Sequence, residues 1–245
     1  MDSLQAGYFR TVTYADSTAP EGPAAGSGLR DCLVVALGLT TGAADVTTFL
    51  ILGKVFSSVI TGNLVLLGLA AGSRSASDAV HAGLAVGGYA AGVAAGTIIA
   101  RRGAGTGDAW PVSVTAALSV ELALLCPFTA LWEATGRQAG PQLTLLAFLA
   151  AAMGVQTAAV RQLGQMSSTY LTSTFAGLVA GLITRGTQEG RWRSAGVIVS
   201  LLAGAYAGAL LLRSAPGAVP ALIAAPLAAV IGAALVRRRV ASAGG

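Results

Sequence analysis

Charged side chains are scarce in this chain, and their scarcity excludes a water-soluble globule. Only 10% of the 245 residues are charged, whereas a soluble domain carries about 25%. Hydrophobic residues make up 54% of the sequence, and the mean hydropathy is +0.72. Such a chain has too little polar surface to cover a globule in water. We therefore expect it to lie in a membrane.

Histidine and cysteine are nearly absent, which excludes the common transition-metal sites and a disulfide framework. The chain has one histidine, His81, and two cysteines, Cys32 and Cys126, which lie far apart in apolar runs. It also lacks a Gly-x-Ser-x-Gly motif, a His–Glu metal motif and a Gly-x-x-x-x-Gly-Lys-Ser/Thr nucleotide loop. We expect no enzymatic activity, no metal, no cofactor and no ATP-driven pumping.

Apolar runs long enough to cross a bilayer recur along the whole chain. A spanning helix needs about 20 apolar residues, and eight runs approach that length: 32–52, 55–72, 79–100, 112–132, 142–160, 168–184, 195–212 and 218–236. They predict an all-α, polytopic transmembrane helical bundle of about eight spans, with six to eight left open.

Two matches within the sequence suggest two related halves. A shift of 111 residues lays "LGKVFSSVIT" (52–61) over "LGQMSSTYLT" (163–172), and a shift of 117 lays "VHAGLAVGGYA" (80–90) over "VIVSLLAGAYA" (197–207). Four spans in each half would make the halves parallel, and three would invert them. Internal repeats are common in secondary transporters, whose site lies at the repeat interface.

The resulting domain organisation has five parts. We predict a disordered polar tail at 1–28, a first transmembrane repeat at 29–132, a connecting loop at 133–141, a second transmembrane repeat at 142–237 and a C-terminal tail at 238–245.

The net charge of +5 is carried by arginine, with Lys54 as the single lysine. In a membrane protein this charge predicts orientation rather than nucleic-acid binding. If the chain has eight spans and an inner N-terminus, five of the 15 cationic residues lie outside and ten inside, the outer ones being Lys54, Arg101, Arg102, Arg161 and Arg213. This distribution obeys the positive-inside rule and predicts that both termini are cytoplasmic.

Glycines recur at four-residue spacing in several runs. Small residues at this spacing let helices approach closely in lipid, so we interpret these glycines as packing positions: Gly38/Gly42, Gly88/Gly92/Gly96, Gly177/Gly181 and Gly204/Gly208. The same faces would also allow a homo-oligomer or the binding of a partner protein.

Two stretches carry a resemblance to a known family. "GAADVTTFLILGKVFSSVITGNLVLLGLA" (42–70) and "MGVQTAAVRQLGQMSSTYLTSTFAGL" (153–178) resemble the YoaK-like family of bacterial inner-membrane proteins of unknown function. The resemblance implies a multi-pass helical fold in the bacterial plasma membrane, often drawn with six spans. It implies no reaction and no substrate. Where the second half of the family often has Thr-Gly, this chain has Thr172-Ser173-Thr174.

Four polar residues within the runs are candidates for a site. Ionisable groups in a membrane span usually face a cavity or a partner, and both Asp45 and Glu121 fall inside apolar runs. Each either couples protons or cations or makes a structural bond, with Lys54 or Arg161 as a partner for Asp45. Gln156 takes the place of Asp45 at the 111-residue shift, so the two would face one pseudo-symmetric site. Arg161 either joins that site or reaches the membrane interface.

The triplet Thr61-Gly62-Asn63 and its counterpart around Thr172 and Thr174 interrupt apolar runs early in their spans. Glycine weakens a helix, and Asn and Thr compete for backbone hydrogen bonds. We expect either an unwound helix that lines a cavity or polar groups that bond one helix to another.

These observations favour a secondary transporter of a small solute, with proton coupling and a polar site between the two repeats. The alternative is a membrane scaffold or accessory subunit that transports nothing and binds a partner through its glycine-rich helix faces. The partners that the sequence indicates are the lipid bilayer, a small solute or ion, and a second copy of the chain at the glycine-rich helix faces, with no nucleic acid.

Overall fold

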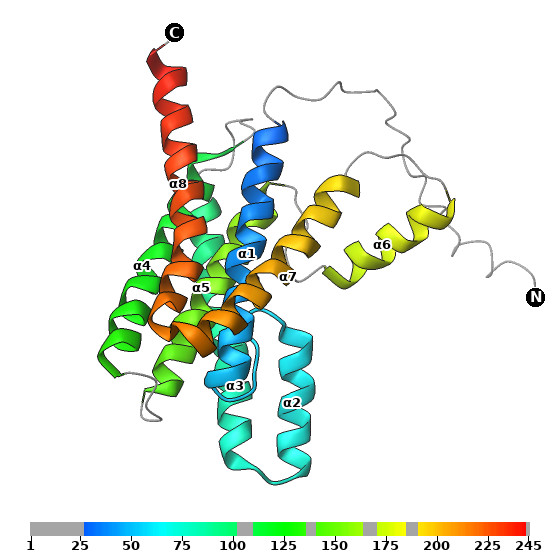
Figure 1. Cartoon of the computed structure of the whole chain (residues 1–245), viewed down its shortest axis with the longest axis vertical. Coiled ribbons are helices and arrows are strands. Elements are labelled where there is room, and N and C mark those ends of the chain that lie inside the picture. The colour runs from blue at the N-terminus through cyan, green and yellow to red at the C-terminus, as the bar shows by residue number, and fades with distance from the viewer. Residues whose placement is uncertain (1–26, 102–109, 136–140, 164–170, 185–190, 244–245) are drawn as a thin grey trace, which may run out of the picture.

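A computed structural model describes residues 27–101, 110–135, 141–163, 171–184 and 191–243. Within these ranges every regular element is helical (Figure 1). The elements are α1 (Ser27–Ile51), α2 (Ile60–Gly72), α3 (Ala76–Arg101), α4 (Val112–Thr135), α5 (Gln142–Gln162), α6 (Leu171–Thr184), α7 (Arg191–Ser214), the short 3-10 helix η2 (Pro216–Ala218) and α8 (Val219–Ala243).

Six of the described helices are long and apolar enough to cross a membrane: α1, α3, α4, α5, α7 and α8. The predicted all-α, polytopic bundle is therefore confirmed. The second and sixth apolar runs instead form the short helices α2 and α6, of 13 and 14 residues. The apolar run 55–72 is only partly helical: its first residues are not helical, and α2 begins at Ile60.

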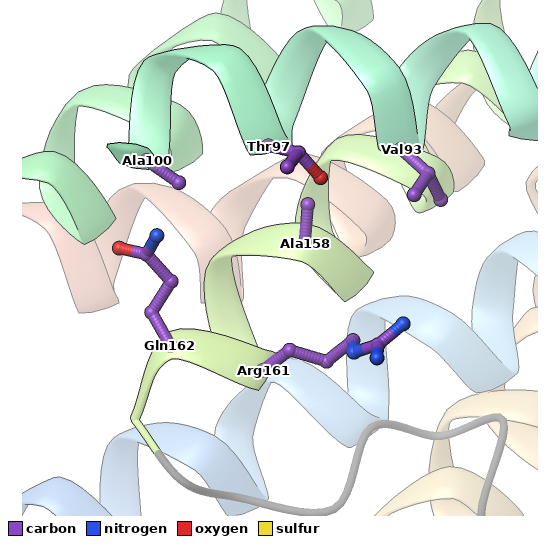
Figure 2. Close-up of a pocket in the computed structure, with 6 residues that line it drawn as sticks. All are labelled: Val93, Thr97, Ala100, Ala158, Arg161 and Gln162. Atoms are coloured by element: carbon purple, nitrogen blue, oxygen red, sulfur yellow. The ribbon is translucent and has the colours of Figure 1, made fainter. Parts of the chain in front are cut away.

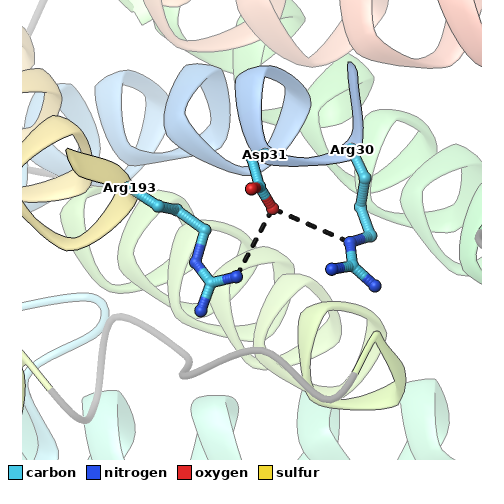
Figure 3. A network of polar contacts seen from close by, with 3 residues as sticks. All are labelled: Arg30, Asp31 and Arg193. Atoms are coloured by element: carbon cyan, nitrogen blue, oxygen red, sulfur yellow. Dashed lines mark hydrogen bonds and ion pairs between the residues drawn. The ribbon is translucent and has the colours of Figure 1, made fainter. Parts of the chain in front are cut away.

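Contacts between helix ends fix the directions of the spans. Asp31 near the start of α1 lies 3.4 Å from Arg193 at the start of α7 (Figure 3). Trp132 Nε1, near the end of α4, donates to the Pro216 carbonyl just before α8, at 3.0 Å. These contacts make α1 parallel to α7 and α4 antiparallel to α8. Figure 1 shows that α1, α4 and α7 run in one direction, and α3, α5 and α8 in the other.

Glycines bring two pairs of parallel helices together, α1 with α7 and α3 with α5. A Cβ on Gly42 would collide with the Leu201 carbonyl, and one on Gly92 would collide with the Ala151 carbonyl. On α7, Gly204 meets the backbone of α1 in the same way. The predicted packing role is confirmed at these positions, whereas Gly177 has open space where a Cβ would lie.

The helices α1 and α5 occupy the middle of the bundle. In the most apolar window of α5, 72% of residues are buried, and in that of α1 61%, against 17% in α7. Large apolar side chains of α4, α5 and α8 fill the core around them, including Leu118, Phe128, Leu149, Met153 and Ile223. Polar side chains on α1, α4 and α5 are therefore the ones enclosed by protein rather than by lipid.

Candidate functional site

Asp45 lies near the end of α1 and is bonded to the segment that follows this helix. Its Oδ1 accepts hydrogen bonds from the Ser57 hydroxyl and from the Ser58 backbone N–H, both at 2.8 Å. Its Oδ2 accepts one from the Ser58 hydroxyl at 2.6 Å. All three residues are buried. The partners of Asp45 are thus serines twelve and thirteen residues along the chain, and not Lys54 or Arg161.

Asn63 holds the same non-helical segment, which runs from Leu52 to Val59 between α1 and α2. Its side-chain Oδ1 accepts from the Phe56 N–H at 2.9 Å, and its Nδ2 donates to the Phe56 carbonyl at 2.6 Å. Asn63 is fully buried. One side chain therefore satisfies both backbone groups of a residue that has no helical partners, as irregular backbone enclosed in a membrane protein requires.

The expectation that the triplet 61–63 is unwound is wrong for the first half of the chain. Thr61, Gly62 and Asn63 form the first turn of α2, and the irregular backbone precedes them. Thr61 is exposed on the helix surface. The amide of Asn63 stabilises the loop instead of breaking the helix. The counterparts Thr172 and Thr174 lie in the first turn of α6, and their side chains are outside the described residues.

Gln156 of α5 points at α1. Its Nε2 donates to the Leu37 carbonyl and to Thr41 Oγ1, both at 3.1 Å, which joins the two central helices. No hydrogen bond connects it with Asp45, whose carboxylate is turned to the loop. The two residues that the internal shift aligns are therefore both buried but are bonded to different partners.

Glu121 is a buried acidic side chain without a hydrogen-bond partner in the part of the chain that the structure describes. It is fully buried in α4, and neither carboxyl oxygen has a hydrogen-bond partner among the described residues. Two further buried oxygens share this property within the described ranges: Oε1 of Gln156 and Oγ1 of Thr40. Burying such groups without a partner costs free energy. Binding of a proton, a water molecule or a ligand at these oxygens would lower that cost.

Hydrogen bonds between helices place these unpartnered oxygens at one level. The Ser113 hydroxyl of α4 donates to Gln162 Oε1 of α5 at 3.0 Å. From that contact Glu121 lies about 12 Å along α4, and Gln156 about 9 Å along the antiparallel α5, at 1.5 Å per residue. Thr40 lies at the same height in the bundle as Gln156, because Gln156 bonds to Leu37 and Thr41, which precede and follow Thr40 on α1.

We call Thr40, Glu121 and Gln156 the central polar level. Glu121 and Gln156 were both predicted as site residues, whereas Thr40 was missed. A threonine in an apolar run is common, and what distinguishes Thr40 is that its buried hydroxyl has no hydrogen-bond partner among the described residues.

Arg161, the remaining candidate site residue, lies at the end of α5. Its side chain is exposed and lines a pocket of about 310 Å³ between α3 and α5, with Thr97 and Gln162 (Figure 2). It is therefore separate from the central polar level, five residues beyond Gln156. Among the residues that the structure describes, no group of three His, Cys, Asp or Glu side chains could hold a metal ion.

A bundle of six long apolar helices with polar groups enclosed at its centre defines a polytopic membrane protein. A family model described as "Protein of unknown function (DUF1275)" matches residues 33–235, and the chain belongs to this family.

The chain is also similar to the UPF0700 transmembrane protein YoaK of Bacillus subtilis (strain 168). The two are 37% identical over 158 residues, which cover 64% of this chain and 68% of the relative. No solved structure matches the chain. The resemblance to YoaK-like membrane proteins is thereby confirmed.

Proposed function

We propose that the protein is a secondary transporter of a small solute, and that Glu121 couples transport to a proton. The observation that carries the proposal is the central polar level. An ionised carboxylate without a partner is expensive inside a bundle, so Glu121 either carries a proton or pairs with a cation that enters. Exchange between these two conditions is the elementary step of proton-coupled transport.

The arrangement of helices supports this function. If the two halves are related, α1 corresponds to α5, α3 to α7 and α4 to α8. The contact of α1 with α7 then corresponds to the contact of α5 with α3, and both pairs pack closely. The pair α4–α5 becomes α8–α1, which is also in contact. Because α1 and α5 run in opposite directions, the two halves would be inverted repeats with three long helices each. Inverted repeats with a site between them are typical of secondary transporters.

The charges at the helix ends support a cytoplasmic location of both termini in a bacterial plasma membrane. With six spans and an inner N-terminus, the outer cationic residues are Lys54, Arg74, Arg137 and Arg213, and the other eleven of the 15 lie inside. This is a stronger inside bias than ten against five for eight spans. The six-span arrangement therefore moves Arg101, Arg102 and Arg161 to the cytoplasmic side, in line with the positive-inside rule.

The alternative, a scaffold that binds a partner through glycine-rich faces, is less well supported. Gly42, Gly92 and Gly204 lie against the chain's own helices, so these three faces have no room for another protein, whereas Gly177 of α6 faces open space.

Proton movement across a membrane tests the proposal. The protein is reconstituted in liposomes that contain a pH-sensitive dye, and a panel of amines, amino acids, sugars and carboxylic acids is added outside. We expect at least one class of solute to drive proton movement, and Glu121→Gln to abolish it.

The matched control is Glu133→Gln, because Glu133 lies on the same helix but is exposed. This variant should behave like the wild type. Solute-driven proton movement at the wild-type rate in Glu121→Gln would contradict the proposal.

A further inference from the structure

The pocket between α3 and α5 lies apart from the central polar level, at the end of the bundle where cationic residues gather. This end holds the start of α1, with Arg30, the start of α7, with Arg193, and the end of α3, with Arg101. The last turns of α8 bring Arg237, Arg238 and Arg239 to the same end (Figure 1). An anionic ligand at this end of the bundle would meet a favourable field.

The pocket begins where the close packing of α3 on α5 ends. Gly96 is the last glycine of the α3 stripe, and a Cβ there would lie 2.7 Å from the Ala158 side chain. Thr97 and Ala100 follow it on α3 and form one wall, and Ala158, Arg161 and Gln162 of α5 form the other. The resulting space has a volume of about 310 Å³.

The polar groups of this pocket are suited to an anion. Arg161 offers guanidinium donors and has no hydrogen-bond or ion-pair partner among the described residues, and Thr97 offers a hydroxyl. Gln162 accepts from the Ser113 hydroxyl through Oε1. In Figure 2 the Gln162 amide points toward Ala100 of α3, and the Arg161 guanidinium extends in the opposite direction. No carboxylate lines the pocket.

The lining also changes character along the bundle axis. Val93 and Ala158 are apolar and lie farther from the helix ends, whereas Arg161 and Gln162 are polar and lie at the end of α5. A phospholipid has the same order, with an apolar chain toward the middle of the membrane and a phosphate at its surface. Basic pockets between spanning helices on the cytoplasmic side are suited to anionic lipid headgroups.

We propose that this pocket binds the phosphate of an anionic phospholipid, with Arg161 as the main ligand. Arg161 pairs with the phosphate oxygens, Thr97 donates to the same group, and the glycerol and upper acyl chain lie on Val93 and Ala158. This inference is independent of transport, because it uses none of the residues of the central polar level.

Lipid binding to the purified full-length protein tests the inference. Dioleoylphosphatidylglycerol is titrated into the protein in detergent, with binding followed by native mass spectrometry and thermal melting. Dioleoylphosphatidylcholine and inorganic phosphate are titrated in parallel. We expect phosphatidylglycerol to bind and to raise the melting temperature, with a much smaller effect of phosphatidylcholine and none of phosphate.

Arg161→Gln should weaken phosphatidylglycerol binding about tenfold or more, as for the loss of a charged hydrogen bond. Arg213→Gln is the matched control, because Arg213 ends α7 at the opposite end of the bundle and is also exposed. Should Arg161→Gln fail to fold, Arg161→Lys keeps the charge but loses the planar fork, and should bind less tightly than the wild type.

Equal phosphatidylglycerol binding by Arg161→Gln, or by Arg161→Lys if the first variant cannot be purified, would overturn the assignment. So would a shift with inorganic phosphate and none with phosphatidylglycerol, since the ligand would then be a soluble anion.

Discussion

Asp45 and Glu121 are acidic residues buried in spanning helices, and they differ in the donors around them. The carboxylate of Asp45 accepts three hydrogen bonds, from Ser57 and Ser58. That of Glu121 accepts none from the described residues. The composition of their helices predicts that both are buried. It does not predict this difference, because the serines of Asp45 come from a loop whose path depends on the whole bundle.

Substitutions at Asp45 should reduce stability in a graded way. Asp45→Leu leaves the buried Ser58 N–H and two hydroxyls unbonded, at a cost of about 3 kcal/mol. Asp45→Asn keeps one acceptor for that N–H, and the Ser58 hydroxyl can rotate to accept from the new amide, so we expect a loss of about 1 kcal/mol. Thermal unfolding in detergent measures both. Equal, small losses for the two variants would show that Asp45 is not a structural anchor of the loop.

Glu121 should show the opposite behaviour. Glu121→Gln and Glu121→Met lose no hydrogen bond, and an apolar side chain of similar volume removes an unpartnered polar group, which is neutral or stabilising. We expect unfolding temperatures equal to or above that of the wild type for both. A clear loss of stability in Glu121→Met would reveal a structural partner and would remove Glu121 from the proposed coupling role.

The non-helical segment between α1 and α2 is the part of the fold that hydropathy describes least well. Val55, Phe56, Val59 and Ile60 keep this stretch apolar on average, so hydropathy alone predicts a span here, although the backbone leaves the helical conformation after Ile51. Lys54 has a φ of +56°, in the left-handed region. What permits this is the bonding of Ser58 and Phe56 to Asp45 and Asn63. Such pairs are not visible in a hydropathy profile.

Asn63→Leu should destabilise the protein by about 2–3 kcal/mol, because it leaves the N–H and carbonyl of Phe56 without partners. Thr61→Val serves as its control: Thr61 is exposed two residues earlier in the same turn, and its loss should change stability by less than about 0.5 kcal/mol. Melting curves of the two variants decide the matter, and similar curves would mean that Asn63 does not hold the loop.

For pairs of helices, in contrast, the four-residue spacing of glycines in the sequence correctly predicts close packing. Gly92→Ala should be strongly destabilising, because its Cβ would overlap the Ala151 carbonyl and force α3 from α5. Gly87→Ala on the same helix has nothing within 4 Å of the new Cβ, and should be neutral or slightly stabilising. Yield and melting temperature after purification compare them. A tolerated Gly92→Ala would contradict the close packing of the two helices.

At the scale of the whole molecule, composition and run length suffice for the class and the approximate number of helices. They overestimate the spans, because α2 and α6 are apolar but only 13 and 14 residues long. Polar residues within apolar runs predict Glu121 and Gln156 as site residues. Their common height in the bundle follows only from the interhelical hydrogen bonds. Thr40 is found solely through its burial without a partner.

The six-span arrangement makes a topological prediction that eight spans would reverse. In a variant without Cys32 and Cys126, a single cysteine at Gly105 should be shielded from impermeant thiol reagents in intact cells. One at Ala139 should be labelled, because the chain crosses the membrane between these positions through α4. Cysteines at Ser17 and Ser242 should also be shielded. Labelling at Gly105 and shielding at Ala139 would contradict the proposed orientation.

The most direct test of the central claim is whether Glu121 exchanges a proton inside the bundle. Infrared difference spectra of the protein in lipid, recorded between two pH values in the physiological range, report the carbonyl band of a protonated carboxyl group. We predict a titrating band that is absent from Glu121→Gln and retained in Asp45→Asn. A band that persists in Glu121→Gln, or no titrating band in the wild type, would contradict proton coupling at Glu121.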